Sequence, residues 1–153
     1  MRKLLYIVIP FLLFAAEDPG GWTKAKWGMS SSEIIKLFQP DATGVSPRIT
    51  VPSYEIAGTK FRVLFILDKD DHLDHVSLSP IEMSDSTDQL FQSLEDLLVE
   101  KYGRPWRSEE AGTTEYQWTF PTTLVTLSRT KSSLGPALLS ISYKHRAPAT
   151  VPL

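Results

Sequence analysis

Residues 84–106 read SDSTDQLFQSLEDLLVEKYGRPW, and this segment predicts one long amphipathic helix between two runs of strands. Its apolar side chains recur at three- and four-residue spacing, so they fall on one face of a helix. That apolar stripe consists of Leu90, Phe91, Leu94, Leu97, Leu98 and Tyr102. Such a stripe is typical of a helix that packs on its own sheet, and we favour that role over insertion into a partner.

Both ends of this helix carry recognisable signals. Ser86 and Gln89 have the spacing of a capping box, and Asp88 lies where the helix dipole favours a negative charge. Gly103 readily takes the left-handed conformation that ends a helix, and Pro105 prevents continuation. We therefore expect the helix to begin just after Ser86 and to end before Gly103.

A short helix and three strands are predicted before the long helix. Ser30 and Glu33 have capping-box spacing, which predicts a helix over residues 31–38 that ends before Pro40. Residues 39–47 read as a loop. Alternating apolar residues then predict strands at 50–56, 60–68 and 73–79.

The segment after the long helix repeats this plan. A loop is expected at residues 107–114, and strands are expected at 115–120, 122–130 and 136–144. The expected fold class is α+β: an antiparallel sheet with two helices on one face, built from duplicated α-β-β-β units at residues 22–80 and 84–145. The other face of the sheet would then be partly open.

The amino end has the composition of a signal peptide. Arg2 and Lys3 precede an apolar run at residues 4–16, which is too short for a bilayer-spanning helix of about 20 residues. We expect a signal peptide at residues 1–16, one α+β domain at 17–145 and a flexible tail at 146–153. The expected location is periplasmic or extracellular, with no stable membrane span after signal removal. An uncleaved amphiphilic anchor is the alternative.

Charge and composition exclude several functions. The formal charge is −2, and loss of Arg2 and Lys3 would make it more negative, so no basic surface for nucleic acid is expected. The chain has no cysteine, which excludes disulfides, thiol catalysis and thiolate zinc sites. A Gly-x-Ser-x-Gly elbow, a phosphate loop and a dinucleotide fingerprint are also lacking. We therefore expect a protein that is not an enzyme, and we assign no catalytic residue and no cofactor.

One cluster of acidic residues and histidines invites comparison with a metal site. Asp68, Asp70, His72 and His75 lie within eight residues. A calcium loop would need glycine at its sixth position and a bidentate glutamate at its twelfth, where Ser79 stands. His72 and His75 would point to opposite faces of a strand. We therefore favour a tight turn made by the aspartates over a metal site.

The four tryptophans are the remaining signal. Trp22 and Trp106 adjoin glycine-rich or loop segments, so they are candidate binding residues as well as candidates for core packing. Trp27 and Trp118 are expected to close the ends of the core.

Several motifs resemble those of small exported bacterial proteins of unknown function. They are Trp27-Gly28-Met29-Ser30 leading to Glu33, then Phe65-Ile66-Leu67-Asp68 followed by Leu73 and Val76, and then Leu97 with Lys101-Tyr102-Gly103. The resemblance implies no catalytic residues. The doubled topology is also similar to the β-lactamase inhibitory protein and to small outer-membrane assembly lipoproteins, which respectively have disulfides and a lipidated cysteine that this chain lacks.

These observations predict an exported, non-enzymatic interaction module. It would bind a protein, a peptide or another envelope component through the open sheet face and nearby loops, over an exposed apolar patch of several hundred Å². The alternative is a small-ligand or envelope-lipid binding protein with a pocket between helices and sheet, in the form of a closed apolar cavity of about 300 Å³ or more. A metal-assisted enzyme at the Asp68–His75 cluster is the third hypothesis.

Overall fold

A computed structural model describes residues 16–82 and 87–147, and it shows a mixed α and β fold that is rich in strand. Ser86 lies outside the described residues, as do nearly all of the expected signal peptide and most of the expected tail. Two helices accompany a large antiparallel sheet, as expected for the fold class. They are α1 (Ser31–Leu37) and α2 (Thr87–Tyr102).

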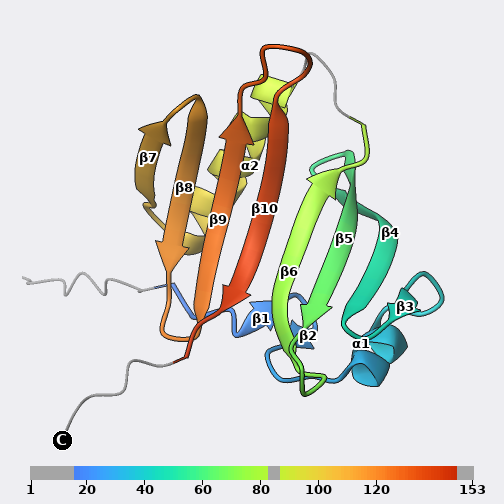
Figure 1. Ribbon diagram of the computed structural model, residues 1–153. Helices are drawn as coiled ribbons and strands as arrows, with labels where there is room; N and C mark the ends of the chain where they lie inside the picture. The colour runs from blue at the N-terminus through green and yellow to red at the C-terminus, as the bar shows by residue number, and fades with distance from the viewer. Residues whose placement is uncertain (1–15, 83–86, 148–153) are drawn as a thin grey trace, which may run out of the picture.

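The large sheet contains eight strands in the order β3-β4-β5-β6-β10-β9-β8-β7 (Figure 1). All neighbouring strands are antiparallel. The strands are β3 (Thr43–Val45), β4 (Arg48–Ile56), β5 (Thr59–Leu67), β6 (Leu73–Pro80), β7 (Trp106–Glu110), β8 (Thr113–Thr119), β9 (Thr123–Thr130) and β10 (Leu138–His145). A separate hairpin is formed by β1 (Gly21–Trp22) and β2 (Ala25–Lys26).

The six predicted strands are confirmed to within two residues, because each has the two-residue periodicity of a strand with one buried face. In β5, Phe61, Val63 and Phe65 are fully buried, whereas Arg62 between them is exposed. These buried side chains join those of the neighbouring strands and of α2 in one core. Because the buried side chains form this core, the face of each strand that carries them points toward α2.

Two strands were missed, and both form edges of the sheet. The predicted loop 39–47 contains β3 and the predicted loop 107–114 contains β7, so both predictions are wrong at these positions. Every residue of β3 is exposed, and β7 carries Arg107, Glu109 and Glu110. Edge strands with no buried face lack the apolar periodicity that identifies a strand in sequence.

The expected capping box at the start of α1 is confirmed. The backbone N–H of Glu33 donates to Ser30 Oγ over 3.3 Å, and the backbone N–H of Ser30 donates to Glu33 Oε2 over 2.8 Å. The helix buries Ile34 and leads to Phe38, whose ring stacks on Trp22. The cap thus starts a short helix that anchors the first half of the core.

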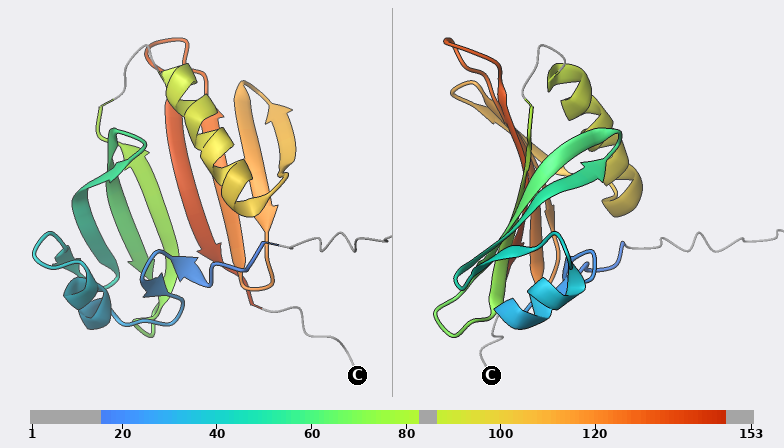
Figure 2. Two further views of the ribbon diagram at one scale, coloured as in Figure 1. Left: turned by 180° about the vertical axis from the view of Figure 1, so that it is seen from behind. Right: turned by 90° about the vertical axis from the view of Figure 1, so that its right-hand side faces the viewer.

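Helix α2 lies across one face of the sheet, over the strands of the second half (Figure 2). It buries Phe91, Leu94 and Leu98. Gly103 follows with φ of +85°, and its N–H donates to the carbonyl of Val99 over 2.8 Å, which confirms the predicted end. Leu97 is 43% exposed, so its predicted place in the buried stripe is wrong.

Both ends of the described chain are fastened to the turn between β8 and β9. The carboxylate of Asp18 accepts hydrogen bonds from the backbone N–H of Thr122 at 2.6 Å and from the hydroxyl of Thr123 at 2.7 Å. At the other end, Arg146 donates its backbone N–H to the Thr122 carbonyl and its guanidinium to the Phe120 carbonyl. This turn therefore holds the first and last described segments together.

Candidate functional site

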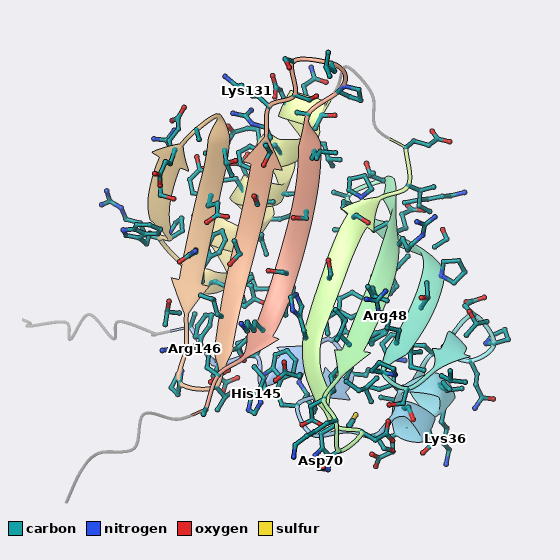
Figure 3. The ribbon with its side chains drawn as sticks, viewed as in Figure 1. Lys36, Arg48, Asp70, Lys131, His145 and Arg146 are labelled. Carbon is teal, nitrogen blue, oxygen red and sulfur yellow. The ribbon has the colours of Figure 1, made fainter. Side chains whose placement is uncertain are left out.

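The face of the sheet opposite α2 carries one continuous row of side chains across all eight strands. Strand pairing aligns Thr43, Thr50, Leu64, Ser77, Ser142, Thr126, Gln117 and Trp106, from one edge of the sheet to the other. Figure 3 looks onto this face and labels Arg48, which is paired with Ile66. Directly paired residues share a face, so the row forms one surface.

Small hydroxyl side chains occupy the centre of this face, and we call it the Ser/Thr face. Its hydroxyl side chains on the central strands β6, β10 and β9 are those of Ser77, Ser79, Ser140, Ser142, Thr126, Ser128 and Thr130, all of which are half-buried. Larger side chains flank this centre, including Leu64 and Arg62 on β5 and Gln117 and Glu115 on β8. The centre of the face, which we call the polar floor, is therefore lined mainly by small hydroxyl side chains, and larger side chains flank it.

The chemistry of this floor suits hydrogen bonding. Each hydroxyl can donate one hydrogen bond and accept two. Thr113 and Thr130 already join their hydroxyls over 3.0 Å at one corner of the face. Serine and threonine also lose little side-chain entropy when a partner orders them, in contrast to lysine or glutamate.

The exposed large hydrophobic side chains of this face are scattered over different strands. Val45 on β3 and Trp106 on β7 lie at opposite edges of the sheet, and Leu138, which is 61% exposed, lies on the central strand β10 opposite Thr130. Leu64 and Ile66 on the Ser/Thr face are half-buried. Recognition on this surface would depend on polar groups more than on apolar burial.

Trp106 is exposed, which agrees with one of its two predicted roles. Its side chain is 62% exposed at the start of the edge strand β7, and it pairs with Gln117 of the Ser/Thr face. Shallow hollows of about 230 and 430 Å³ adjoin it. On the other face of β7, the Arg107 guanidinium binds Glu109 at 2.8 Å and lies over the Tyr116 ring.

Trp22 lies in the core, so the prediction of an exposed Trp22 is wrong. Only 5% of it is exposed, and its ring contacts those of Phe38, Tyr54 and Phe65 at centroid distances of 5.0–5.9 Å. The β1–β2 hairpin turns it inward. A Cβ atom on Gly21 would collide with the backbone of Ala25, so this close hairpin requires glycine.

The other two tryptophans pack at the ends of the core, as expected. Trp118 is buried, and its indole N–H donates to the carbonyl of Gly103 over 2.7 Å. Trp27 is partly buried, and its indole N–H donates to Thr123 Oγ1 over 2.9 Å. Each ring thus satisfies its one polar group while covering apolar surface.

Of the four residues considered as metal ligands, Asp68, Asp70 and His72 lie in the turn between β5 and β6. Asp68 Oδ1 accepts the backbone N–H groups of Asp70 and His72, each over 2.9 Å. The His72 bond is the main reason why the pKa of Asp68 is lowered. His75 lies further along β6, opposite Lys144. Within residues 16–82 and 87–147, no three metal-binding side chains converge on one point.

His75 adds a titratable group to the Ser/Thr face. It is half-buried, and its cross-strand neighbours are Ile66 on β5 and Lys144 on β10. Burial is the main cause that lowers its pKa, and the positive charge of Lys144 lowers it further. The ring is therefore neutral at pH 7, with one nitrogen that donates and one that accepts hydrogen bonds.

A second hollow lies on the other face of the sheet, beside α2. We call it the α2 pocket; its volume is about 270 Å³. It is lined by Trp22, Thr23, Tyr54, Glu55, Ile56, Leu78, Leu94, Leu97, Leu98, Lys101, Ile141 and Tyr143. Leu97 and the charged Glu55 and Lys101 are exposed, so the expectation of a closed cavity is wrong.

The size of the sheet explains why this pocket exists. Eight strands are separated by seven intervals of about 4.8 Å and span roughly 34 Å, whereas a helix with its side chains is about 10 Å wide. Helix α2 therefore leaves part of the apolar face beside it uncovered. The alternative hypothesis expected a pocket between helices and sheet, but periodicity could not identify the residues that line it, because no periodicity records the space between elements.

Comparison with known proteins adds no assignment to either site. The chain matches no family model, and it has no significant match among curated proteins or solved structures. Of the helices that the structure describes, none is long and apolar enough to cross a membrane.

Proposed function

We propose that this chain is an exported, non-enzymatic interaction module that binds a protein or peptide through the Ser/Thr face, with Trp106 at its margin. The observation that carries the proposal is the row of side chains that runs unbroken across eight strands. An uncovered sheet with a floor of hydroxyls is suited to a flat polar partner. Export rests on the signal-peptide composition of residues 1–16.

The arrangement of the halves supports the finer architecture that we propose. Strands β3–β6 and β7–β10 occur in mirrored order about the contact between β6 and β10, and a helix precedes each set. Duplication of a unit of one helix and four strands, one strand more than the predicted α-β-β-β unit, with both helices on one face, accounts for this order. It also accounts for a second face without helices, which remains available for a partner.

The dimensions of the Ser/Thr face suit a protein partner. Eight strands span roughly 34 Å, and strands of eight residues run about 26 Å, so the face covers on the order of 900 Å². A stable protein interface buries about 800 Å² on each side. Trp106 is of the residue type that most often dominates interface energy, and its exposed ring lies at the edge of this area.

The test places a photo-crosslinking residue at position 142, in the centre of the Ser/Thr face, and at position 93, on the exposed side of α2. Cells that export the protein are irradiated, and the adducts are identified by mass spectrometry. We expect one partner to crosslink from position 142 and not from position 93. Equal labelling at both positions, or no adduct at position 142, would contradict the proposal.

A substitution series then measures the same contact with the purified partner. Ser142→Arg fills the polar floor and should weaken binding at least tenfold, whereas Ser93→Arg should leave it unchanged. Circular dichroism confirms that both variants fold. The mass of the exported chain tests the remaining part of the proposal, since cleavage after Ala16 removes residues 1–16.

A further inference from the structure

The α2 pocket is built from buried apolar side chains of separate elements. Leu78 of β6 and Ile141 of β10 come from the sheet, Leu94 and Leu98 come from α2, and Trp22 comes from β1; each is at most 7% exposed. When an apolar ligand displaces water from a concave apolar site, the free energy of the system falls. The pocket therefore favours a hydrocarbon group.

Hydrogen-bond donors gather near the end of α2. Lys101 lines the pocket, and among the described residues its ammonium group has no carboxylate partner within ion-pair distance. The next residue, Tyr102, shares one hydrogen bond of 3.3 Å with Tyr143, which also lines the pocket. Only one of the two hydroxyl groups can donate in that hydrogen bond. The hydroxyl hydrogen of the other tyrosine therefore has no acceptor among the described side chains.

Two carbonyl groups at the end of α2 and just beyond it already accept hydrogen bonds. The N–H of Gly103 binds the Val99 carbonyl, and the indole of Trp118 binds the Gly103 carbonyl. Glu55 lies on the rim of the same pocket and comes from β4. Its charge repels an anion and so directs a negative group toward Lys101.

We propose that the α2 pocket binds a single-chain aliphatic carboxylic acid. The hydrocarbon chain lies against Leu78, Leu94 and Ile141, and the carboxylate binds Lys101. The volume of about 270 Å³ is just below the range of roughly 300–1,000 Å³ for drug-sized ligands, which excludes a lipid with two acyl chains. This site is independent of the Ser/Thr face, because it lies on the opposite side of the sheet.

Decanoate and decyltrimethylammonium are the probes for this proposal, because they have the same alkyl chain and opposite charges. Binding is measured by calorimetry at low ionic strength, below the concentration at which either probe forms micelles. Methyl spectra of Leu78, Leu94 and Ile141 locate the site. We expect decanoate to bind more tightly than the cation and to shift these methyl signals.

Variants of the rim test the role of charge without disturbing the core. Lys101→Met should weaken decanoate binding roughly three- to fivefold, as expected for an exposed ion pair, and Glu55→Gln should strengthen it. Lys36→Met, on the exposed side of α1, is the matched control and should change nothing. Leu97→Trp should block the pocket from its rim.

Three results would overturn the proposal. Decanoate could fail to bind, the two probes could bind equally, or the methyl shifts could appear away from the pocket. An unchanged decanoate affinity in Lys101→Met would likewise exclude the carboxylate contact. None of these results bears on crosslinking at position 142, so the two proposals can fail separately.

Discussion

Ile141 of β10 lies directly opposite Leu78 of β6, at the last paired position between these two strands. Four residue pairs join β6 to β10, whereas eight join β9 to β10. Both side chains are buried, and both line the α2 pocket. The contact between the two halves of the sheet therefore depends on apolar packing as well as on backbone hydrogen bonds. Substitution of one apolar side chain can measure how much the packing contributes to stability.

Truncation of Ile141 should destabilise the fold and enlarge the α2 pocket. Ile141→Ala removes buried methyl groups and should lower the free energy of unfolding by about 2–4 kcal/mol. Leu138→Ala, three residues earlier on the same strand, changes a side chain that is 61% exposed and should alter stability by no more than about 0.5 kcal/mol. Urea denaturation measures both. Similar losses for the two variants would contradict this account of the junction.

Asp18 should make stability depend on pH in the acid range. Burial alone would raise its pKa, but hydrogen bonds from the Thr122 N–H, the Thr123 hydroxyl and the Gly20 N–H outweigh burial, so the folded pKa lies below 3.8. As the pH falls below about 4, the unfolded chain takes up this proton first, and the stabilisation that is complete at higher pH is lost.

Asp18→Asn tests this dependence. An amide N–H₂ replaces one of two oxygens that both accept hydrogen bonds, so the variant should lose about 2 kcal/mol at pH 7. It should also lose less stability than the natural protein between pH 5 and pH 3. Thermal denaturation over that range measures the difference, and parallel pH profiles would show that Asp18 does not contribute.

His75 should affect stability nearer to neutral pH. Its pKa is lowered below 6.5 in the folded protein, mainly by burial and then by Lys144, so the unfolded chain binds the proton first as the pH falls through 6.5. Stability is therefore highest above pH 6.5 and decreases toward the folded pKa. NMR titration of the ring should give a pKa that rises when Lys144 is replaced by Met. No change in that variant would contradict the electrostatic part of this explanation.

Alanine substitutions at two glycines distinguish the stability cost of a steric clash from that of a positive φ angle. Gly21 and Gly28 both have positive φ, but only at Gly21 would a Cβ atom overlap another backbone segment, at Ala25. Gly28→Ala should cost about 1 kcal/mol, the usual price of a left-handed non-glycine residue. Gly21→Ala should cost about 3 kcal/mol or more, because the hairpin that turns Trp22 inward must open. Equal costs, measured by urea denaturation, would show that space is not limiting.

The sequence predicts the features of this fold that are local. The capping box at Ser30 and the helix end at Gly103 depend on residues within one turn, and alternation in β5 depends on a single strand. Edge strands β3 and β7 were missed because they bury nothing. Their pairing partners make them strands, and pairing across a sheet leaves no local pattern.

The candidate sites depend on tertiary placement, which explains why they were predicted less well. Trp106 was a candidate and is exposed, but Trp22 was turned into the core by a tight glycine hairpin. The Ser/Thr face arises from seven strand pairings that bring scattered serines and threonines into register. In isolation, each of these residues resembles an ordinary polar position on a strand.

The fastening of Asp18 and Arg146 to one turn has a consequence for chain connectivity. Both segments bind residues 120–123, so the first and last described parts of the chain meet at one point on the molecule. The two ends of the described backbone therefore lie near each other. A short linker between them would permit circular permutation, with new ends opened in the exposed Ser132–Gly135 segment and every strand pairing of the sheet retained.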